Sequence, residues 1–405
     1  MKIQKVDGNE NEKNEITKKQ IIILIILLLV LVFVIYQAYI LTLYTFGKKE
    51  KKQLKLYNYC DSIISKVMGK EIILKEEYSL KFAGIGDINA SEKLGNFKVL
   101  QNYNNILGLT QVIDKLNTYD IITASVSGSI LKENYDFEGI MKLLKNSNIS
   151  TVALANYNIF NKNESGLIKT IDNLDENGIN QIGVNSTNTR KDPIIISKNQ
   201  ISIGFLSYTT KTNQKLNKNN TNMVNIFSDE NLKYDLEYLN SKNVDFIVAY
   251  LNVPTNNSNV ITYEQKNIVE KLFLSGVDVV LGTGNTNVQE QIEEVEIDKP
   301  VYAIYSLGNF YGNFEDNEEN FSVIANIEFK KNVTKDQDGN LKQVEKDMIM
   351  NEPITVLKDI NKNKIEYIML SEEIKRYDEG NSNITLEYYN KIKNMENRLK
   401  NIIDP

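Results

Sequence analysis

The polar residues best placed to do chemistry lie at or just after short apolar segments of the chain. Asp87 supplies a carboxylate, and the other candidates carry amide or hydroxyl oxygens: Ser127, Asn156, Asn158, Asn252, Thr283, Thr286 and Asn309. Oxygen ligands of this kind suit Mg²⁺ or Ca²⁺, although sites for these ions usually hold more carboxylates. The same side chains could form hydrogen bonds with a glycan, a peptide or a polyglutamate strand, and Asp87 could simply cap a turn.

The chain of 405 residues contains no histidine. Histidine is the commonest neutral metal ligand and the only side chain that ordinarily titrates near neutral pH. We therefore expect no catalytic residue and no cofactor. A divalent cation held by Asp87 is the alternative.

The elements that position these side chains follow from the alternation of short apolar strands with helical segments. Strands are predicted at 79–85, 121–126, 151–155, 201–206, 246–251, 277–281 and 301–305. This alternation predicts an α/β fold with largely parallel, buried sheets. Ligands of such sheets bind at the carboxyl ends of the strands, where all the candidates fall.

An apolar segment near the N-terminus predicts a membrane anchor. Residues 21–46 carry no charge, and a helix of that length reaches roughly 39 Å, enough to cross a hydrocarbon core of about 30 Å. Lysines flank the segment on both sides in equal number, so charge alone does not orient the helix. The net charge of −6 argues against a nucleic-acid partner, which would require a basic surface.

Five motifs, at 84–87, 154–158, 166–183, 265–282 and 305–310, occur in one order along the chain. In their residues and spacing they resemble the bacterial CapA family, the membrane-anchored accessory proteins of capsule and poly-gamma-glutamate production. The sequence Tyr-Ser-Leu-Gly-Asn-Phe at 305–310 matches the closing motif of that family without a change. The resemblance covers about 79–329. It implies a metallophosphatase-like layered sandwich of sheets flanked by helices, preceded by one transmembrane helix.

The departures from the family pattern fall on its functional positions. Ser127 replaces a glutamate, Asn158 replaces a histidine, and the family's histidine-rich loop becomes Gly-Thr-Gly-Asn-Thr at 282–286. Asp87 is the one family metal ligand that remains. A two-metal site needs several histidines and carboxylates together, so the resemblance implies a folded pseudoenzyme.

The predicted organisation is a tail at 1–19, an anchor at 20–46, a helical stalk at 47–77, the CapA-like domain at 78–330 and strands with a helix completing it at 331–405. We expect a single-pass protein of the cell membrane with its C-terminal domain on the extracytoplasmic side. The expected function is a non-catalytic accessory role in synthesis, assembly or export of an envelope polymer, with the polymer and the membrane subunits of its synthase as partners. Two alternatives remain: a hydrolase or transferase using a metal at Asp87, and a purely structural envelope protein.

Overall fold

The computed structural model describes residues 29, 31–36, 73–90, 106, 108–132, 137–255, 258–292, 299–312, 321–336, 339–361 and 364–404. The chain divides into two compact units, Met1–Glu76 with Val333–Val344 and Glu77–Asn332 with Glu345–Pro405. The second unit contains every candidate site residue.

Most of the predicted N-terminal tail, anchor and stalk lies outside the described residues. Within the predicted anchor, Leu29 and residues 31–36 are helical. Among the residues that the structure describes, no helix is long and apolar enough to cross a membrane. The first strand begins at Leu74, so the last four residues expected in the helical stalk are strand instead.

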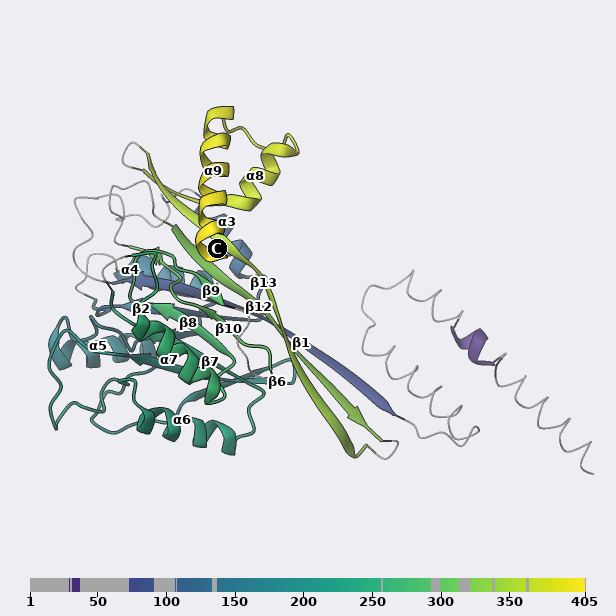
Figure 1. The fold of residues 1–405 in the computed structure, drawn as a ribbon, viewed down its shortest axis with the longest axis horizontal. Coiled ribbons are helices and arrows are strands. Elements are labelled where there is room, and N and C mark those ends of the chain that lie inside the picture. The colour runs from purple at the N-terminus through teal and green to yellow at the C-terminus, as the bar shows by residue number, and fades with distance from the viewer. Residues whose placement is uncertain are drawn as a thin grey trace, which may run out of the picture. The chain divides into compact units, whose positions relative to one another are not determined.

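The first sheet has eight strands in the order β14-β13-β12-β1-β2-β3-β4, with β11 also paired to β1. Its long strands β12 and β13 lie side by side (Figure 1). Their bounds are β1 Leu74–Asn89, β2 Ile121–Ser127, β3 Thr151–Ala153, β4 Asn180–Ile182, β11 Asn309–Tyr311, β12 Phe321–Lys335, β13 Leu341–Asn361 and β14 Lys364–Met369. The consecutive pairs from β1 to β4 are parallel, whereas β13 and β14 are antiparallel.

The second sheet has six strands in the order β5-β6-β7-β8-β10-β9. Their bounds are β5 Ile194–Lys198, β6 Ile201–Thr209, β7 Phe246–Asn252, β8 Val279–Thr283, β9 Gln291–Ile292 and β10 Tyr302–Ile304. The four central strands are parallel, and the edge strands β5 and β9 run antiparallel to their neighbours. The predicted parallel pairing is therefore confirmed for the four central strands of this sheet and for β1 to β4 of the first sheet.

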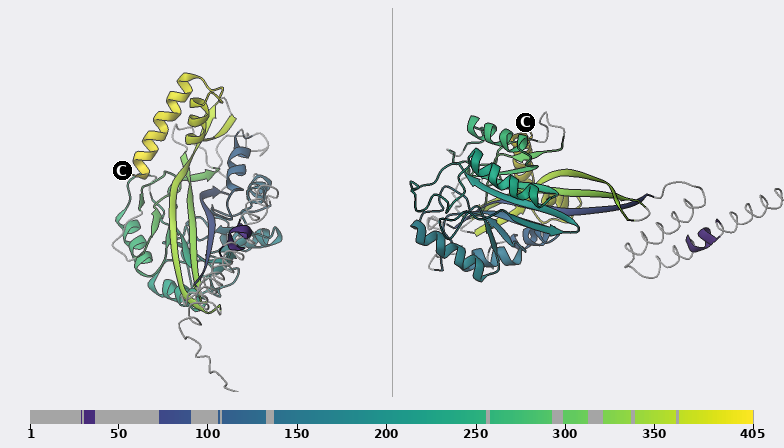
Figure 2. Two further views of the ribbon diagram at one scale, coloured as in Figure 1. Left: turned by 90° about the vertical axis from the view of Figure 1, so that its right-hand side faces the viewer. Right: turned by 90° about the horizontal axis from the view of Figure 1, so that it is seen from below.

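Helices cover the outer faces of both sheets (Figure 2). The helices are α3 Leu109–Leu116, α4 Phe137–Asn146, α5 Asn163–Glu176, α6 Asp229–Ser241, α7 Tyr263–Leu274, α8 Leu370–Asp378 and α9 Leu386–Ile403. Apolar residues of α3, α4 and α5 pack on the first sheet, and those of α6 and α7 pack on the second. This arrangement is the layered α/β sandwich that the sequence predicts.

A separate apolar core joins the two sheets to each other. Phe82 of β1 lies 6.0 Å from Phe205 of β6, and Phe246 of β7 lies 4.5 Å from Phe329 of β12, between ring centroids. Side chains of α8 and α9 extend the same core. Because inward and outward faces are both apolar, the parallel strands read as continuous hydrophobic runs in the sequence.

Candidate functional site

The fold brings most of the predicted site residues together at the carboxyl ends of the parallel strands. Asp87 is aligned with Asn309 on one side, and Asn89, two residues further on, is aligned with Ser127 on the other. In the second sheet, Asn252 is aligned with Thr283. A backbone hydrogen-bond donor after β3, the N–H of Tyr157, reaches Asn252 Oδ1 at 3.1 Å and connects the ends of the two sheets.

Asp87 is buried, with 6% of its surface exposed, and its carboxylate is occupied by protein donors. Ser125 Oγ donates to Asp87 Oδ1 at 2.5 Å, and the backbone N–H of Gly284 also donates to the carboxylate. Burial raises the pKa of Asp87, and these two hydrogen bonds only partly offset that effect. Asp87 thus ties the end of β1 to β2 and to the loop after β8.

Asn156 is also committed to internal contacts. Its Nδ2 donates to the carbonyl oxygens of Val126 and Leu154, both at 2.8 Å. Its Oδ1 accepts the backbone N–H of Asn158 at 2.9 Å and that of Gly128 at 3.4 Å. This side chain fixes the loop after β3 to the end of β2, and its amide has little capacity left for a ligand.

Asn252 plays the same part in the second sheet. Its Oδ1 accepts the Tyr157 backbone N–H and also Thr209 Oγ1 at 3.2 Å, while its Nδ2 donates to Thr283 Oγ1 at 3.1 Å. Asn252 and Thr283 are each 3% exposed. The two residues predicted here as ligand groups therefore bind each other.

Of the remaining candidates, Asn158 and Thr286 are partly exposed, whereas Ser127 and Asn309 are buried. Asn158 Nδ2 lies 3.4 Å from Ser127 Oγ, a long hydrogen bond between a partly buried amide and a buried hydroxyl. Thr286 is partly buried in the loop that follows β8. Asn309 is 6% exposed at the start of β11. Any ligand at this end of the sheets would meet Asn158 and Thr286 more readily than Asp87.

The residues present do not fit the two-metal centre that the family resemblance implies. Such a centre needs several imidazoles and carboxylates around two ions, but Asp87 is the one carboxylate among the eight candidate residues, and it already accepts two hydrogen bonds. Asn156 and Asn252 use their amide oxygens internally. No group of three or more His, Cys, Asp or Glu side chains that could hold a metal occurs in the described part of the chain.

Sequence reasoning missed a buried lysine beside this site. Lys358 of β13 is 2% exposed, and its Nζ donates to the carbonyl oxygen of Asn309. Burial lowers the pKa of Lys358 to about 7. On the neighbouring strand, Tyr367 Oη donates to the carbonyl oxygen of Phe310 at 2.8 Å. Two side chains of the C-terminal strands thus hold the backbone of the closing motif.

The sequence did not predict a role for Lys358, because it did not predict strand β13, in which Lys358 lies. β13 contains many charged residues and a proline, Pro353, both of which are unusual in a central strand. Only its pairing beside β12 and β14 makes it part of the first sheet.

Comparison with known proteins finds a match to one protein family and a distant similarity to several solved structures. The family described as "Bacterial capsule synthesis protein PGA_cap" matches residues 86–313, more than half of the chain. No curated protein matches the chain.

Among solved structures, a 5'-nucleotidase precursor from Thermus thermophilus is 13% identical with a TM-score of 0.37, over 67% of this chain and 54% of that one. The Thermus thermophilus sulfate thiohydrolase SoxB in complex with glycerol is 9% identical with a TM-score of 0.37, over 67% and 56%. TT1561 of Thermus thermophilus is 8% identical with a TM-score of 0.36, over 61% and 93%.

The chain spans about half the length of the first two of these structures. At such TM-scores the likeness says nothing about chemistry, and the assignment rests on the family match. That match runs from the Gly-Asp turn at the end of β1 to just beyond the Leu-Gly-Asn-Phe turn before β12. The chain belongs to the bacterial capsule synthesis protein family PGA_cap.

Proposed function

We propose that this protein is a non-catalytic, membrane-anchored accessory protein in the synthesis, assembly or export of a capsule polymer, poly-gamma-glutamate or another envelope polymer. Membership of the capsule synthesis family supports the capsule part of the proposal. The metallophosphatase-like sandwich serves in this view as a scaffold that contacts the polymer or the membrane subunits of its synthase.

The observation that carries the non-catalytic part is the internal use of the polar side chains at the strand ends. Asp87 accepts from Ser125 and Gly284, and Asn252 donates to Thr283. Groups that activate water or bind a metal must present a free lone pair to it. In this chain Ser125 and Gly284 occupy part of the acceptor capacity of Asp87, and Tyr157 and Thr209 occupy the amide oxygen of Asn252.

Membrane anchoring rests on the uncharged segment at 21–46, and the extracytoplasmic placement rests on the family resemblance. An anchored domain outside the cell would meet the polymer as it emerges from its synthase. Protease added to intact cells should then cut the domain. Protection in intact cells, with ready cleavage after lysis, would overturn this topology.

The test is a complementation series in the source bacterium with the gene deleted and surface polymer quantified. The full chain and an Asp87→Asn variant should both restore the polymer, because a carboxamide oxygen can still accept hydrogen bonds from Ser125 and Gly284 but lacks the negative charge that a metal centre with one carboxylate would need. A chain whose residues 1–46 are replaced by a cleavable signal peptide should be secreted and should fail to restore it.

The outcome of the series separates the alternatives. If Asp87→Asn behaves like the deletion although the protein reaches the membrane in normal amount, a hydrolase or transferase centred on Asp87 becomes the better account. Metal analysis of the full chain and of Asp87→Asn after exposure to Mn²⁺, Zn²⁺, Mg²⁺ and Ca²⁺ then tests that account directly. If only truncation after Gly380 removes function, the protein is a structural one that acts through α9.

A further inference from the structure

The loop that joins β6 to α6, residues 210–228, is positively charged in a chain whose net charge is −6. No acidic residue occurs between Asp192 and Asp229. The loop contains three lysines, all of them exposed: Lys211, Lys215 and Lys218. A local excess of one sign of charge attracts partners of the opposite sign. This loop therefore favours an anionic partner.

The ammonium groups of these three lysines are not used inside the protein. None of them forms an ion pair or a hydrogen bond with a residue that the structure describes. Other lysines of the chain are paired, as Lys331 is with Asp245 at 2.8 Å. Glu164 is an acidic residue that contacts the loop, but its carboxylate accepts a hydrogen bond from Asn220 Nδ2 at 2.8 Å. The charge of the loop is therefore available to a partner.

The first half of the loop is fixed to the segment that follows β3. The backbone N–H of Asn213 donates to the carbonyl oxygen of Tyr157 at 2.8 Å, and Asn213 Nδ2 donates to Asn161 Oδ1 at 2.8 Å. Gln214 Nε2 donates to the carbonyl oxygen of Phe160 at 2.7 Å. These contacts hold the loop beside the carboxyl ends of the strands, where part of the candidate site lies.

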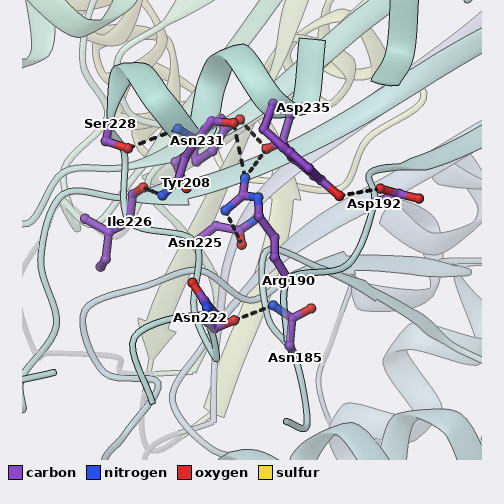
Figure 3. Close-up of polar contacts among 11 residues, drawn as sticks. Asn185, Arg190, Asp192, Tyr208, Asn222, Asn225, Ile226, Ser228, Asn231 and Asp235 are labelled. Atoms are coloured by element: carbon purple, nitrogen blue, oxygen red, sulfur yellow. Dashed lines mark hydrogen bonds and ion pairs between the residues drawn. The ribbon is translucent and has the colours of Figure 1, made fainter. Parts of the chain in front are cut away.

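The second half of the loop is fixed by the segment that follows β4 (Figure 3). Asn185 Nδ2 donates to the carbonyl oxygen of Asn222 at 2.5 Å, and Arg190 Nη1 donates to Asn225 Oδ1 at 3.3 Å. The charge of Arg190 is balanced by Asp235 of α6, whose Oδ2 lies 2.6 Å from Nη2. Arg190 thus positions the loop, and the three lysines supply its charge.

A loop held at both ends presents its lysines without first having to become ordered, which lowers the entropic cost of binding. A single exposed ion pair strengthens binding by at most about fivefold, so one anion on one lysine would dissociate readily. Three lysines between positions 211 and 218 can engage several charges of one chain at once, and linked contacts reinforce each other. The partner that fits is therefore a chain with repeated negative charges.

We propose that the lysine surface, defined as Lys211, Lys215 and Lys218, binds a linear polymer that carries repeated carboxylate or phosphate groups. The inference rests on the proposed function and deepens it, because it states that the envelope polymer is anionic and names the loop that contacts it.

The test measures binding to the full chain in a non-ionic detergent by fluorescence anisotropy. The probes are labelled poly-gamma-glutamate, labelled polyphosphate and labelled neutral dextran. At least one anionic probe should bind, more weakly as salt is added, and dextran should not. Replacing all three lysines by glutamine should weaken binding about ten- to hundredfold. The preference between the two anionic probes identifies the anionic group, and either preference supports the proposal.

The matched control replaces three other exposed lysines by glutamine: Lys142 and Lys145 of α4 and Lys266 of α7. This variant has the same net charge as the loop variant. It should bind the anionic probes as the natural protein does, because the position of the charge decides binding. Thermal unfolding of both variants verifies that they are folded.

Three results would overturn the proposal. One is that neither anionic probe binds the full chain, or that dextran binds equally well. Another is that the loop variant and the control variant bind equally, which would place the polymer elsewhere. The third is that vesicles of phosphatidylglycerol, but neither anionic polymer, bind through the three lysines, which would make the loop a membrane contact.

The complementation series separates failure of this inference from failure of the proposed function. The loop variant should restore less surface polymer than the control variant at equal amounts of membrane protein. If both restore it fully, the proposed function stands and the lysine surface is not the contact. If deletion of the gene leaves the polymer unchanged, the proposed function fails, whereas the binding measurement still tests the lysine surface.

Discussion

Gly86 and Gly308 lie so close that a Cβ atom added to Gly86 would be 2.1 Å from the carbonyl oxygen of Gly308. The backbone of Asp87 donates to that same carbonyl at 3.2 Å. The first and last motifs of the family match are therefore two sides of one contact between β1 and the turn before β11. The backbone of the turn leaves no room for a side chain at position 86, so the fold requires a glycine there.

Gly86→Ala should lower the free energy of unfolding by about 1–3 kcal/mol, because the new methyl group meets backbone that cannot rotate away. Gly84→Ala is the control. Its Cβ would meet Leu281 Cδ1 at 2.3 Å, and a side-chain end can change rotamer. Urea unfolding of both variants measures the difference. A Gly86→Ala protein no less stable than Gly84→Ala would contradict the close approach described here.

Asn156→Ala should cost about 2–4 kcal/mol of stability, because it leaves the Val126 carbonyl and the Asn158 N–H without partners in a buried place. Asn158→Ala, two residues away, should cost less than about 1 kcal/mol, since its amide makes one long hydrogen bond. Thermal unfolding of the two variants tests the contrast. Equal losses would mean that Asn156 does not organise the loop, and would return it to the set of possible ligand groups.

The pKa of Asp87 predicts an unusual pH dependence. Burial raises this pKa above its ordinary value of 3.8, so the folded state binds the proton more tightly than the unfolded state. Stability is then lost as pH rises from about 4 through the folded pKa. Asp87→Asn removes that loss, and its unfolding free energy relative to the natural protein should rise with pH between pH 4 and neutrality.

Asp245→Asn is the control, because the pKa of Asp245 is shifted in the opposite direction to that of Asp87. Burial alone would raise the pKa of Asp245, but Lys331, Ser202 and Lys346 together lower it. Ionised Asp245 therefore stabilises the fold above pH 4, and its replacement should destabilise the protein at neutral pH. If both asparagine variants shift stability in the same direction with pH, the opposite environments of the two carboxylates are refuted.

The sequence predicted strands correctly where a run of apolar residues marks them. It did not predict contacts that depend on segments far apart in the chain. The apolar runs at 121–126 and 246–251 predict β2 and β7 almost to the residue, because strands buried on both faces are apolar throughout. The run at 246–251 also locates Asn252 at a strand end, and the run at 79–85 places Asp87 near the end of β1. Their hydrogen-bond partners, however, come from segments far away in the chain, so the sequence suggested ligand groups where the structure has internal contacts.

Strand β13 is an element that the sequence did not predict. Its run of charged and polar residues carries no strand periodicity, and it becomes a strand only because β12 and β14 offer backbone partners. Lys358, facing the core from this strand, could not be expected by any rule that places lysine on the surface. A buried polar residue in a missed strand is the kind of feature that requires a structure.

Lys358→Met should change the pH dependence of stability in the alkaline range. Burial lowers the pKa of Lys358 to about 7 from 10.5, so the unfolded state binds the proton more tightly and the folded state gains stability as pH rises from 7 towards 10.5. Between pH 7 and pH 9 this gain amounts to about 2–3 kcal/mol. The variant lacks this gain, and the unfolding free energies of the natural protein and Lys358→Met should diverge by that amount over the interval.

Lys393→Met, at a fully exposed position on α9, is the control and should follow the natural protein. Parallel curves for the natural protein and Lys358→Met would show that the ammonium group reaches water, and that the closing motif is not held by a buried amine.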